Sequence, residues 1–332
     1  MPRLFITSIT TVAALLVIPM LALAGMKFAL VPKAMNNPFF DLARDGCKKA
    51  EGELDDVECY YIGPSEHTEL EQIQIVQDLI SQGVDGIAVS PSNAPAMAKA
   101  LSRAKAAGIP VMTWDADLLD KDKAIRATYV GTKNYDIGVN LAKIAMSLKP
   151  AGGSLCLQTG GAAAANHNER LQGIRDTLGG TSGTTPPGTP LDGANGWKEV
   201  AGCPLITDDD SAKAVQGLAD ILNKYAGELD VFISTGAFTQ WSDNAYRQAV
   251  SPHKARMDSK ELIVVVADTL PMQMQQLQDG FSHGQVGQRP FEMGYQAMYV
   301  LKDLVAGKSV DDPIYTGLDV CDQSNASNCL AK

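Results

Sequence analysis

The sequence predicts an α/β protein with two lobes, each a parallel sheet covered by helices on both faces. The chain has 332 residues, more than one compact domain usually holds. Short runs rich in β-branched residues alternate with amphipathic segments, and helical crossovers of this kind join parallel strands. The alternation starts again after residue 131, so two α/β units follow one another in one chain.

The first unit contains five predicted strands and three predicted helices. Residues 69–82 carry apolar side chains at intervals of three and four, which places them on one face of a helix. Another helix is expected to stop at Gly108, because glycine is favoured just after a helix end. The predicted strands are 27–31, 57–62, 86–90, 109–114 and 127–131, and the predicted helices are 40–54, 69–82 and 94–107.

The second unit repeats the pattern and contains a long loop. Its predicted helices are 137–148, 168–178, 211–225 and 239–250, and its predicted strands are 153–159, 202–206, 231–234 and 262–267. Residues 179–195 (GGTSGTTPPGTPLDGAN) are rich in Gly, Thr and Pro, which is typical of a surface loop. An interdomain linker is the alternative, but the helix before it and the strand after it fit one lobe. Parallel sheets bind ligands beyond the carboxyl ends of their strands, so the site is expected in the cleft between the lobes.

Residues 1–24 have the pattern of a secretory signal peptide. Arg3 precedes an apolar run that ends in Ala22-Leu23-Ala24, a small-x-small sequence that signal peptidase accepts. We expect cleavage after Ala24 and a periplasmic protein. An uncleaved membrane anchor is the alternative, and Pro19 together with the cleavage pattern argues against it.

Charge and cysteine content agree with export. The formal net charge is -10 and the pI is about 4.9, so neither a nucleic-acid partner nor attraction to anionic lipid is expected. Six cysteines suit an oxidising compartment. The sequence cannot determine their connectivity, and pairs close in sequence are our hypothesis: Cys47–Cys59, Cys156–Cys203 and Cys321–Cys329. Cys156 lies in an apolar strand, so a buried free thiol is an open alternative there.

The motifs that usually carry catalysis are missing. The sequence has no G-x-G-x-x-G, no phosphate-binding G-x-x-x-x-G-K-[ST] and no G-x-S-x-G elbow. Its four histidines are not spaced as a metal pair, so we predict no cofactor, no metal and no enzymatic activity. His167 could enter the cleft, although a surface or supporting role is favoured. The acidic run 208–210 suits a helix start, with one carboxylate expected to point into the cleft.

Short motifs in a fixed order cover nearly the whole mature chain. They are residues 36–40 (NNPFF), 77–80 (QDLI), 83–87 (GVDGI), 107–111 (AGIPV), Asp115, Glu169-Arg170 with Gly173, 265–268 (VVAD), 278–280 (QDG) and 287–288 (GQ). With them the chain resembles the ribose/galactose-type periplasmic binding proteins of ABC importers. The resemblance implies two Rossmann-like lobes joined by a three-segment hinge (type I periplasmic binding protein). It assigns residues 25–131 plus 289–317 to the N-terminal lobe and 132–288 plus 318–332 to the C-terminal lobe.

The resemblance also implies a set of ligand-binding residues. Two phenylalanines would stack on a sugar ring, and carboxylates and amides would bind its hydroxyls. Either phenylalanine could instead belong to the core, and Lys33 could form an ion pair within the cleft rather than contact the ligand. The candidate ligand-binding residues are Lys33, Asn37, Phe39, Phe40, Trp114, Asp115, Asp117, Asn168, Asp209, Thr235, Trp241, Asp268 and Gln288.

Departures from the family pattern bear on the ligand. Two arginines of ribose-binding members are replaced by Ala116 and Asn168, while Asp117 and Asp209 add carboxylates. A more negative cleft is therefore expected, and ribose itself is in doubt. Unpaired buried charge is costly, so a cationic ligand could compensate for it. We expect a neutral sugar or polyol, with an amino sugar as a variant.

The sequence therefore indicates the solute-binding component of an ABC importer, which closes on a small sugar-like ligand. The expected partner is an inner-membrane ABC permease, and a monomer is expected. A periplasmic sensory receptor of the same fold is an alternative. A periplasmic sugar-active enzyme is less favoured, since no base and nucleophile can be assembled from these residues.

Overall fold

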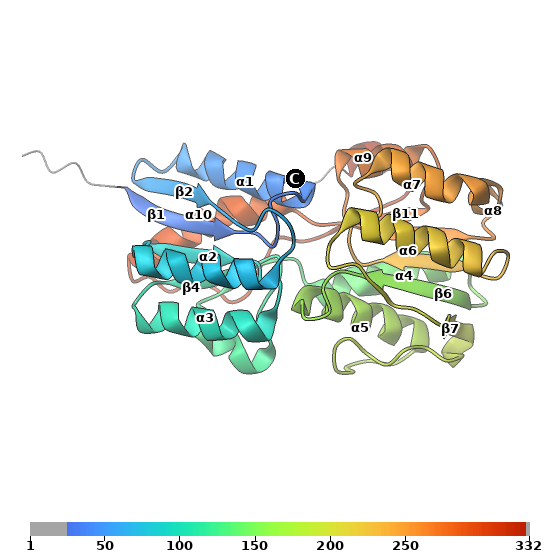
Figure 1. The fold of residues 1–332 in the computed structure, drawn as a ribbon, viewed down its shortest axis with the longest axis horizontal. Helices are drawn as coiled ribbons and strands as arrows, with labels where there is room; N and C mark the ends of the chain where they lie inside the picture. Colours follow the sequence, from blue (N-terminus) through green and yellow to red (C-terminus); the bar gives the residue numbers. More distant parts are fainter. Residues whose placement is uncertain (1–24, 330–332) are drawn as a thin grey trace, which may run out of the picture.

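The computed structural model describes residues 25–329, so the predicted signal peptide at 1–24 lies outside the described residues. Two lobes lie side by side along the long axis of the molecule (Figure 1). Each lobe is a sheet with helices on both faces, which confirms the predicted fold class. Among residues 25–329, no helix is both long and apolar enough to cross a membrane.

The N-terminal sheet has six parallel strands. Side chains of β1 alternate across it, with Phe28 and Leu30 in the core on one face and Ala29 and Val31 in the core on the other. The strand order is β12 (Ile314–Tyr315), β5 (Tyr129–Gly131), β4 (Val111–Trp114), β3 (Gly86–Val89), β1 (Met26–Val31) and β2 (Val57–Tyr61). The helices are α1 (Pro38–Glu51) and α10 (Pro290–Val305) on the first face, and α2 (Glu69–Gln82) and α3 (Ala94–Ala106) on the second.

The C-terminal sheet is parallel except for its last strand. The order is β13 (Asp319–Cys321), β11 (Gly284–Gly287), β10 (Ile263–Ala267), β9 (Val231–Ser234), β6 (Gly153–Thr159) and β7 (Trp197–Glu199), with β8 (Leu205–Ile206) also paired to β6. Strand β13 runs antiparallel to β11. One face packs against α4 (Asn134–Leu148) and α5 (Ala165–Gly179). The other packs against α6 (Ser211–Lys224), α7 (Asp243–Val250) and α8 (Lys254–Asp258), and α9 (Pro271–Gln278) precedes β11.

The chain passes between the two sheets three times, after β5, after β11 and after β12. Two of these passages are hydrogen-bonded to each other, because Thr132 Oγ1 donates to the carbonyl oxygen of Gly317 at 3.0 Å. Arg289 in the remaining passage forms an ion pair with Asp319 at 3.4 Å. The three passages therefore form one narrow connection between the lobes.

Several elements differ from the prediction near the cleft and the long loop, and among them α4 begins at Asn134 rather than at 137. Helix α5 begins at Ala165, three residues earlier than expected, so its first turn reaches the cleft. Helix α7 begins at Asp243 rather than 239, because the Gln240 side chain accepts hydrogen bonds from Gln273 and Gln285 and holds the preceding turn. Strand β7 was not predicted. It pairs with β6, so the Gly-rich loop before it stays within the second lobe, as predicted.

All three proposed disulfides are present. Cys47–Cys59 joins α1 to β2, and Cys321–Cys329 closes a short loop after β13. Cys156–Cys203 links the buried strand β6 to the segment before β8, which answers the open question about Cys156 in favour of the disulfide. The described residues contain no free cysteine.

A candidate ligand site between the lobes

A small cavity lies between the lobes, at the carboxyl ends of the strands. Lys33 follows β1, Asp115 follows β4, Asp268 follows β10 and Gln288 follows β11. This is the edge where parallel sheets place their ligands. The lining residues are Lys33, Asn37, Phe39, Phe40 and Asp115 from the first lobe, and Asn166, His167, Arg170, Asp209, Gly236, Phe238, Trp241, Asp268 and Gln288 from the second lobe and its passage.

Three lining carboxylates stand on left-handed backbone. The φ angle is 57° at Asp115 and at Asp209 and 73° at Asp268. Residues other than glycine rarely adopt this region, and it costs on the order of 1–3 kcal/mol each. Such strain persists where the surroundings determine the conformation, and it gathers at ligand sites. Each turn directs its carboxylate to the inner face of the cleft.

Asp115 is the meeting point of the two lobes. Its Oδ2 accepts a hydrogen bond from the Ser90 hydroxyl at 2.7 Å and lies 3.5 Å from Lys33 Nζ. Its Oδ1 lies 3.9 Å from Arg170 Nη2, which belongs to the opposite lobe. Lys33 Nζ also crosses the cleft and donates to Asn166 Oδ1 at 2.9 Å. Lys33 thus forms the ion pair foreseen for it and lines the cavity as well.

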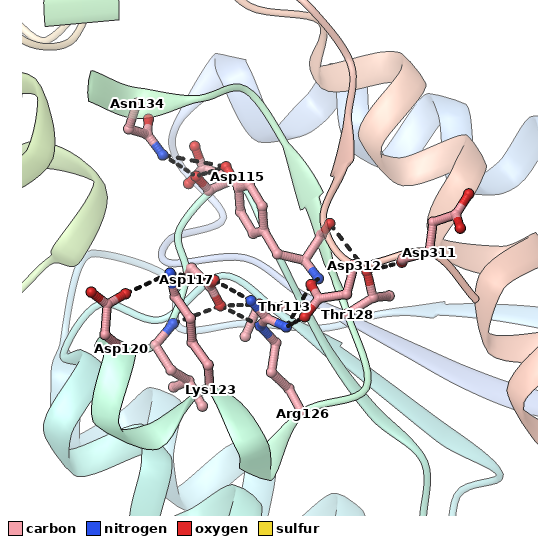
Figure 2. A network of polar contacts seen from close by, with 12 residues as sticks. Thr113, Asp115, Asp117, Asp120, Lys123, Arg126, Thr128, Asn134, Asp311 and Asp312 are labelled. Carbon is pink, nitrogen blue, oxygen red and sulfur yellow. Dashed lines mark hydrogen bonds and ion pairs between the residues drawn. The ribbon is translucent and has the colours of Figure 1, made fainter. Parts of the chain in front are cut away.

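Arg170 is held in place by two groups behind the cavity. Its Nε donates to Asn134 Oδ1 at 2.9 Å, and its Nη1 donates to the Thr235 carbonyl oxygen at 2.8 Å. The Asn134 amide in turn donates to the Asp115 carbonyl oxygen at 3.3 Å, a contact drawn in Figure 2. These bonds orient the planar guanidinium so that Nη2 points toward the cleft, where it has no hydrogen-bond partner among the described residues.

Asp268 is buried on the second-lobe side of the site. Its Oδ1 accepts from Gln288 Nε2 at 2.8 Å, and its Oδ2 accepts from the backbone N–H of Ala237 at 3.2 Å. Burial raises the pKa of Asp268, while Arg170 and these hydrogen bonds oppose the rise.

His167 and Asp209 form a second polar corner. His167 Nδ1 lies 3.0 Å from the Thr235 hydroxyl, and its Nε2 lies 3.6 Å from Asp209 Oδ1. Burial, reinforced by the positive charges of Lys33 and Arg170, holds the pKa of His167 well below its usual value. The imidazole is therefore neutral and offers one N–H donor and one acceptor.

Aromatic side chains reach the cavity from both lobes. Phe39 and Phe40 form an edge-to-face pair with ring centroids 5.3 Å apart. On the other side, Phe238 is in edge contact with Trp241 at 5.5 Å and with His167 at 5.3 Å. Flat apolar faces of this kind suit the C–H face of a sugar ring.

Four buried polar atoms of the lining residues have no hydrogen-bond partner within the described part of the chain. Two are donors, Arg170 Nη2 and Trp241 Nε1, and two are acceptors, Asp209 Oδ1 and Gln288 Oε1. Buried polar groups are normally paired, and an unpaired one costs about 1–3 kcal/mol. Their gathering around one cavity indicates a ligand that both donates and accepts hydrogen bonds.

Four of the predicted residues lie outside the lining. The Trp114 ring belongs to the core against Phe40, with centroids 5.5 Å apart. Asp117 is bound by Arg126, with Nη2 and Oδ2 only 2.6 Å apart. The Asn168 side chain donates to the carbonyl oxygen of Ala162 on its own lobe. Thr235 stands behind the lining, where it supports Arg170 and His167.

The sequence prediction missed several lining residues: Asn166, His167, Arg170, Gly236 and Phe238. Asn166 and His167 lie in the first turn of α5, which was expected to start only at residue 168, and for His167 a surface or supporting role was favoured over the cleft. Asn166, His167 and Arg170 stand at positions i, i+1 and i+4, a spacing that would have placed them on one side of a helix. Arg170 belongs to the family motif Glu169-Arg170, and this motif was the sequence signal that could have identified it as a lining residue.

A family model for the periplasmic binding protein domain matches residues 28–309. The chain belongs to this family. The predicted recognition is thus confirmed, with a periplasmic location and a role as the solute-binding component of an ABC importer rather than an enzyme. The comparisons lend no support to the sensory-receptor alternative.

The relatives of this periplasmic binding protein match it at low identity over most of its length. The ribose import binding protein RbsB of Salmonella typhimurium is 23% identical over 92% of this chain and 93% of its own. The xylose/arabinose-binding protein XylF of Sulfolobus acidocaldarius is 25% identical over 81% of this chain, and the match spans 63% of that protein. An ABC transporter solute-binding protein from Burkholderia graminis C4D1M, solved in complex with D-arabinose, is 28% identical. The structural match covers 93% of this chain and 99% of the Burkholderia graminis chain, with a TM-score of 0.78.

Proposed function

We propose that this periplasmic binding protein captures a neutral monosaccharide in the cavity between its lobes. The observation that carries the proposal is the mixture of unpartnered atoms around one cavity with aromatic walls: Arg170 Nη2 and Trp241 Nε1 as donors, Asp209 Oδ1 and Gln288 Oε1 as acceptors. A hydroxyl group donates and accepts at once, so a polyhydroxyl ring suits such a mixture. The D-arabinose complex of the Burkholderia graminis protein supports the same ligand class.

The charge around the cavity favours a neutral sugar over an amino sugar. Asp117 is paired with Arg126 away from the cavity, so it adds no charge to the site. The remaining carboxylates Asp115, Asp209 and Asp268 face two cations, Lys33 and Arg170. An excess of one carboxylate can be met by hydroxyl donors. The amino sugar remains the variant, with Asp209 as the partner for its ammonium group.

We propose hinge closure as the mechanism, with residues 25–131 plus 289–317 moving against residues 132–288 plus 318–332. A ligand that contacts both lobes binds the closed state more tightly than the open one and shifts the population by that difference. The closed surface would then be recognised by an inner-membrane permease. A monomeric mature protein that begins after Ala24 completes the proposal.

A thermal-shift panel tests the ligand class. The mature protein would be heated with pentoses, hexoses, polyols and amino sugars, since a ligand that binds only the folded state raises Tm by mass action. A shift of several degrees from neutral aldoses, with smaller shifts from their amino analogues, is the expected result. A panel led by amino sugars would overturn the neutral-sugar proposal, and no shift at all would overturn sugar capture.

Removal of the amide that Lys33 contacts across the cleft is expected to weaken binding. In Asn166→Ala, Lys33 Nζ loses its 2.9 Å acceptor on the opposite lobe, and a hydrogen bond from a charged group contributes about 1.5–3 kcal/mol. We expect a Kd increase of about 10-fold or more, measured by calorimetry with the best sugar of the panel. Asn168→Ala is the matched control, because that side chain bonds only within its own lobe. Equal losses in both variants would contradict the role given to Asn166.

A further inference from the structure

A second, larger cavity lies behind the ligand site and next to the passages between the lobes. Its first-lobe side is a network of charged groups, seen in Figure 2. Asp117 accepts from Arg126 Nε and Nη2, each at 2.6 Å, and Arg126 Nη1 binds Asp312 at 2.7 Å. Lys123, on the short 3-10 helix Asp120–Ile125, pairs with Asp120 at 2.7 Å and lies 3.9 Å from Asp117.

This network carries excess negative charge before the second lobe contributes anything. Asp117, Asp120 and Asp312 supply three carboxylates, and Lys123 and Arg126 supply two cations. All of these groups belong to the first lobe or to the segment before β12. A further carboxylate that enters from the opposite lobe meets no free cation here.

Glu169 is that further carboxylate. It stands on α5 of the second lobe and lines the cavity opposite Asp117, Lys123 and Asp312. Within the described residues its side chain forms no hydrogen bond and no ion pair, and Lys123 and Arg170 act on it only through longer-range charge. The other cations nearby are committed elsewhere or lie at the edge: Lys133 pairs with Asp136, Arg170 is bound to Asn134 and Thr235, and Lys121 borders the adjoining groove.

Burial of Glu169 depends on the two lobes being together. Asp117, Lys123 and Asp312 come from the first lobe, whereas Lys133 and Asn134 come from the second, so separation of the lobes removes the first-lobe side of its surroundings and exposes the carboxylate more fully. In this structure Lys33 bridges the lobes to Asn166, so we take it as the closed state; here burial raises the pKa of Glu169 from 4.5 to about 7, with Lys123 opposing the rise and Asp117 and Asp120 adding to it.

We propose that Glu169 couples closure of the lobes to the uptake of a proton, so that the closed, ligand-holding state is favoured when this carboxyl is protonated. The inference rests on the proposed hinge closure. In the open state an exposed Glu169 releases its proton near its ordinary value, and in the closed state it keeps it to higher pH. The closed state is therefore favoured at the lower end of the pH range between 4.5 and about 7, and it loses that advantage as the pH rises through about 7.

His167 acts in the opposite direction. Its pKa is lowered in the closed structure, so closure must release a proton from it below its ordinary value of 6.5. The pH profile of the unaltered protein is therefore the sum of two opposing effects. A comparison of Glu169→Gln with the unaltered protein at each pH cancels the His167 contribution, because both proteins carry that histidine.

The test measures the Kd of the unaltered protein and of Glu169→Gln for the same sugar, and takes the ratio of these two values at about pH 5 and again at about pH 8. D-ribose and D-arabinose are the probes. Glutamine has the shape of the protonated acid. We expect Glu169→Gln to bind about 10-fold or more tightly than the unaltered protein at the higher pH, with the two converging at the lower pH. Glu261→Gln, an exposed glutamate of the second lobe, is the control and should keep the ratio near one.

A ratio that does not change with pH, or one that Glu261→Gln reproduces, would overturn the coupling. If neither sugar binds any variant at either pH, the proposed ligand fails, and closure is then read by small-angle X-ray scattering. In that case the coupling is supported if the radius of gyration of the unaltered protein is smaller at the lower pH than at the higher pH, and if Glu169→Gln shows no such difference. An unchanged radius in both proteins overturns it.

Discussion

Arg170→Met is expected to weaken sugar binding by about 100- to 1,000-fold. The guanidinium lies 3.9 Å from Asp115 across the cleft, and it opposes the rise that burial causes in the pKa of Asp268. Its removal leaves Lys33 as the one lining cation for three carboxylates, and we expect a cost near the lower end of the range of about 3–5 kcal/mol for a broken buried pair, equivalent to two to three powers of ten in Kd. The cost falls on the closed state, where Asp115 and Arg170 face each other. Calorimetry with the best sugar of the panel measures it.

A second arginine on the same helix provides the control. Arg175 is also buried, but it forms a bidentate ion pair with Glu199 at 2.8 Å and does not line the cavity. Arg175→Met is therefore expected to lower Tm and to leave Kd nearly unchanged. Arg170→Lys keeps the charge but cannot donate along two fixed directions to Asn134 and Thr235, so an intermediate loss is expected. An affinity loss in Arg175→Met equal to that in Arg170→Met would contradict a direct role for Arg170.

Removal of the Cys156–Cys203 disulfide is expected to produce the largest loss of stability among the three bridges. It closes a loop with a sequence separation of 47, and loop-closure entropy predicts that such a bridge contributes about 4 kcal/mol to the free energy of unfolding. The double variant Cys156→Ala/Cys203→Ala should lose on the order of 10 °C in Tm, as measured by calorimetry of the mature protein.

The bridge Cys321–Cys329 provides the comparison. Its sequence separation is only 8, so the same relation predicts a contribution of about 2.5 kcal/mol and a smaller fall in Tm. An equal or larger loss from Cys321→Ala/Cys329→Ala would show that chain entropy does not govern these bridges. Sugar affinity should change little in either variant, because no cysteine lines the cavity.

Much of the architecture could be predicted because its signals are local. Strand and helix alternate with their own periodicities, and residues after strand ends, such as Asp115, Asp268 and Gln288, collect at one edge of a parallel sheet. The disulfides joined cysteines that are close in sequence, so the simplest pairing was the one found. The ordered family motifs extended these local signals over nearly the whole mature chain, and the family model matches residues 28–309.

The charge of the site was a matter of tertiary structure. Asp117 was expected in the cleft, but Arg126, nine residues later, binds it on the far side of the strand end. Conversely, Arg170 enters the cleft because Asn134, from another helix, accepts a hydrogen bond from its Nε–H group. The excess of carboxylate at the cavity is therefore smaller than expected, three carboxylates against two cations, which favours the neutral sugar that was expected first over its amino-sugar variant.

The sequence by itself determined the fold class, the family and the strand ends that supply most of the site, because these depend on periodicity and on residues adjacent in the chain. Only the tertiary structure decided which polar groups are satisfied by the protein and which are left for a ligand. That outcome depends on partners tens of residues apart, such as Lys33 with Asn166 across the cleft. It also decided that Glu169 meets a negative network on the other lobe, since the contact exists only when the two lobes come together.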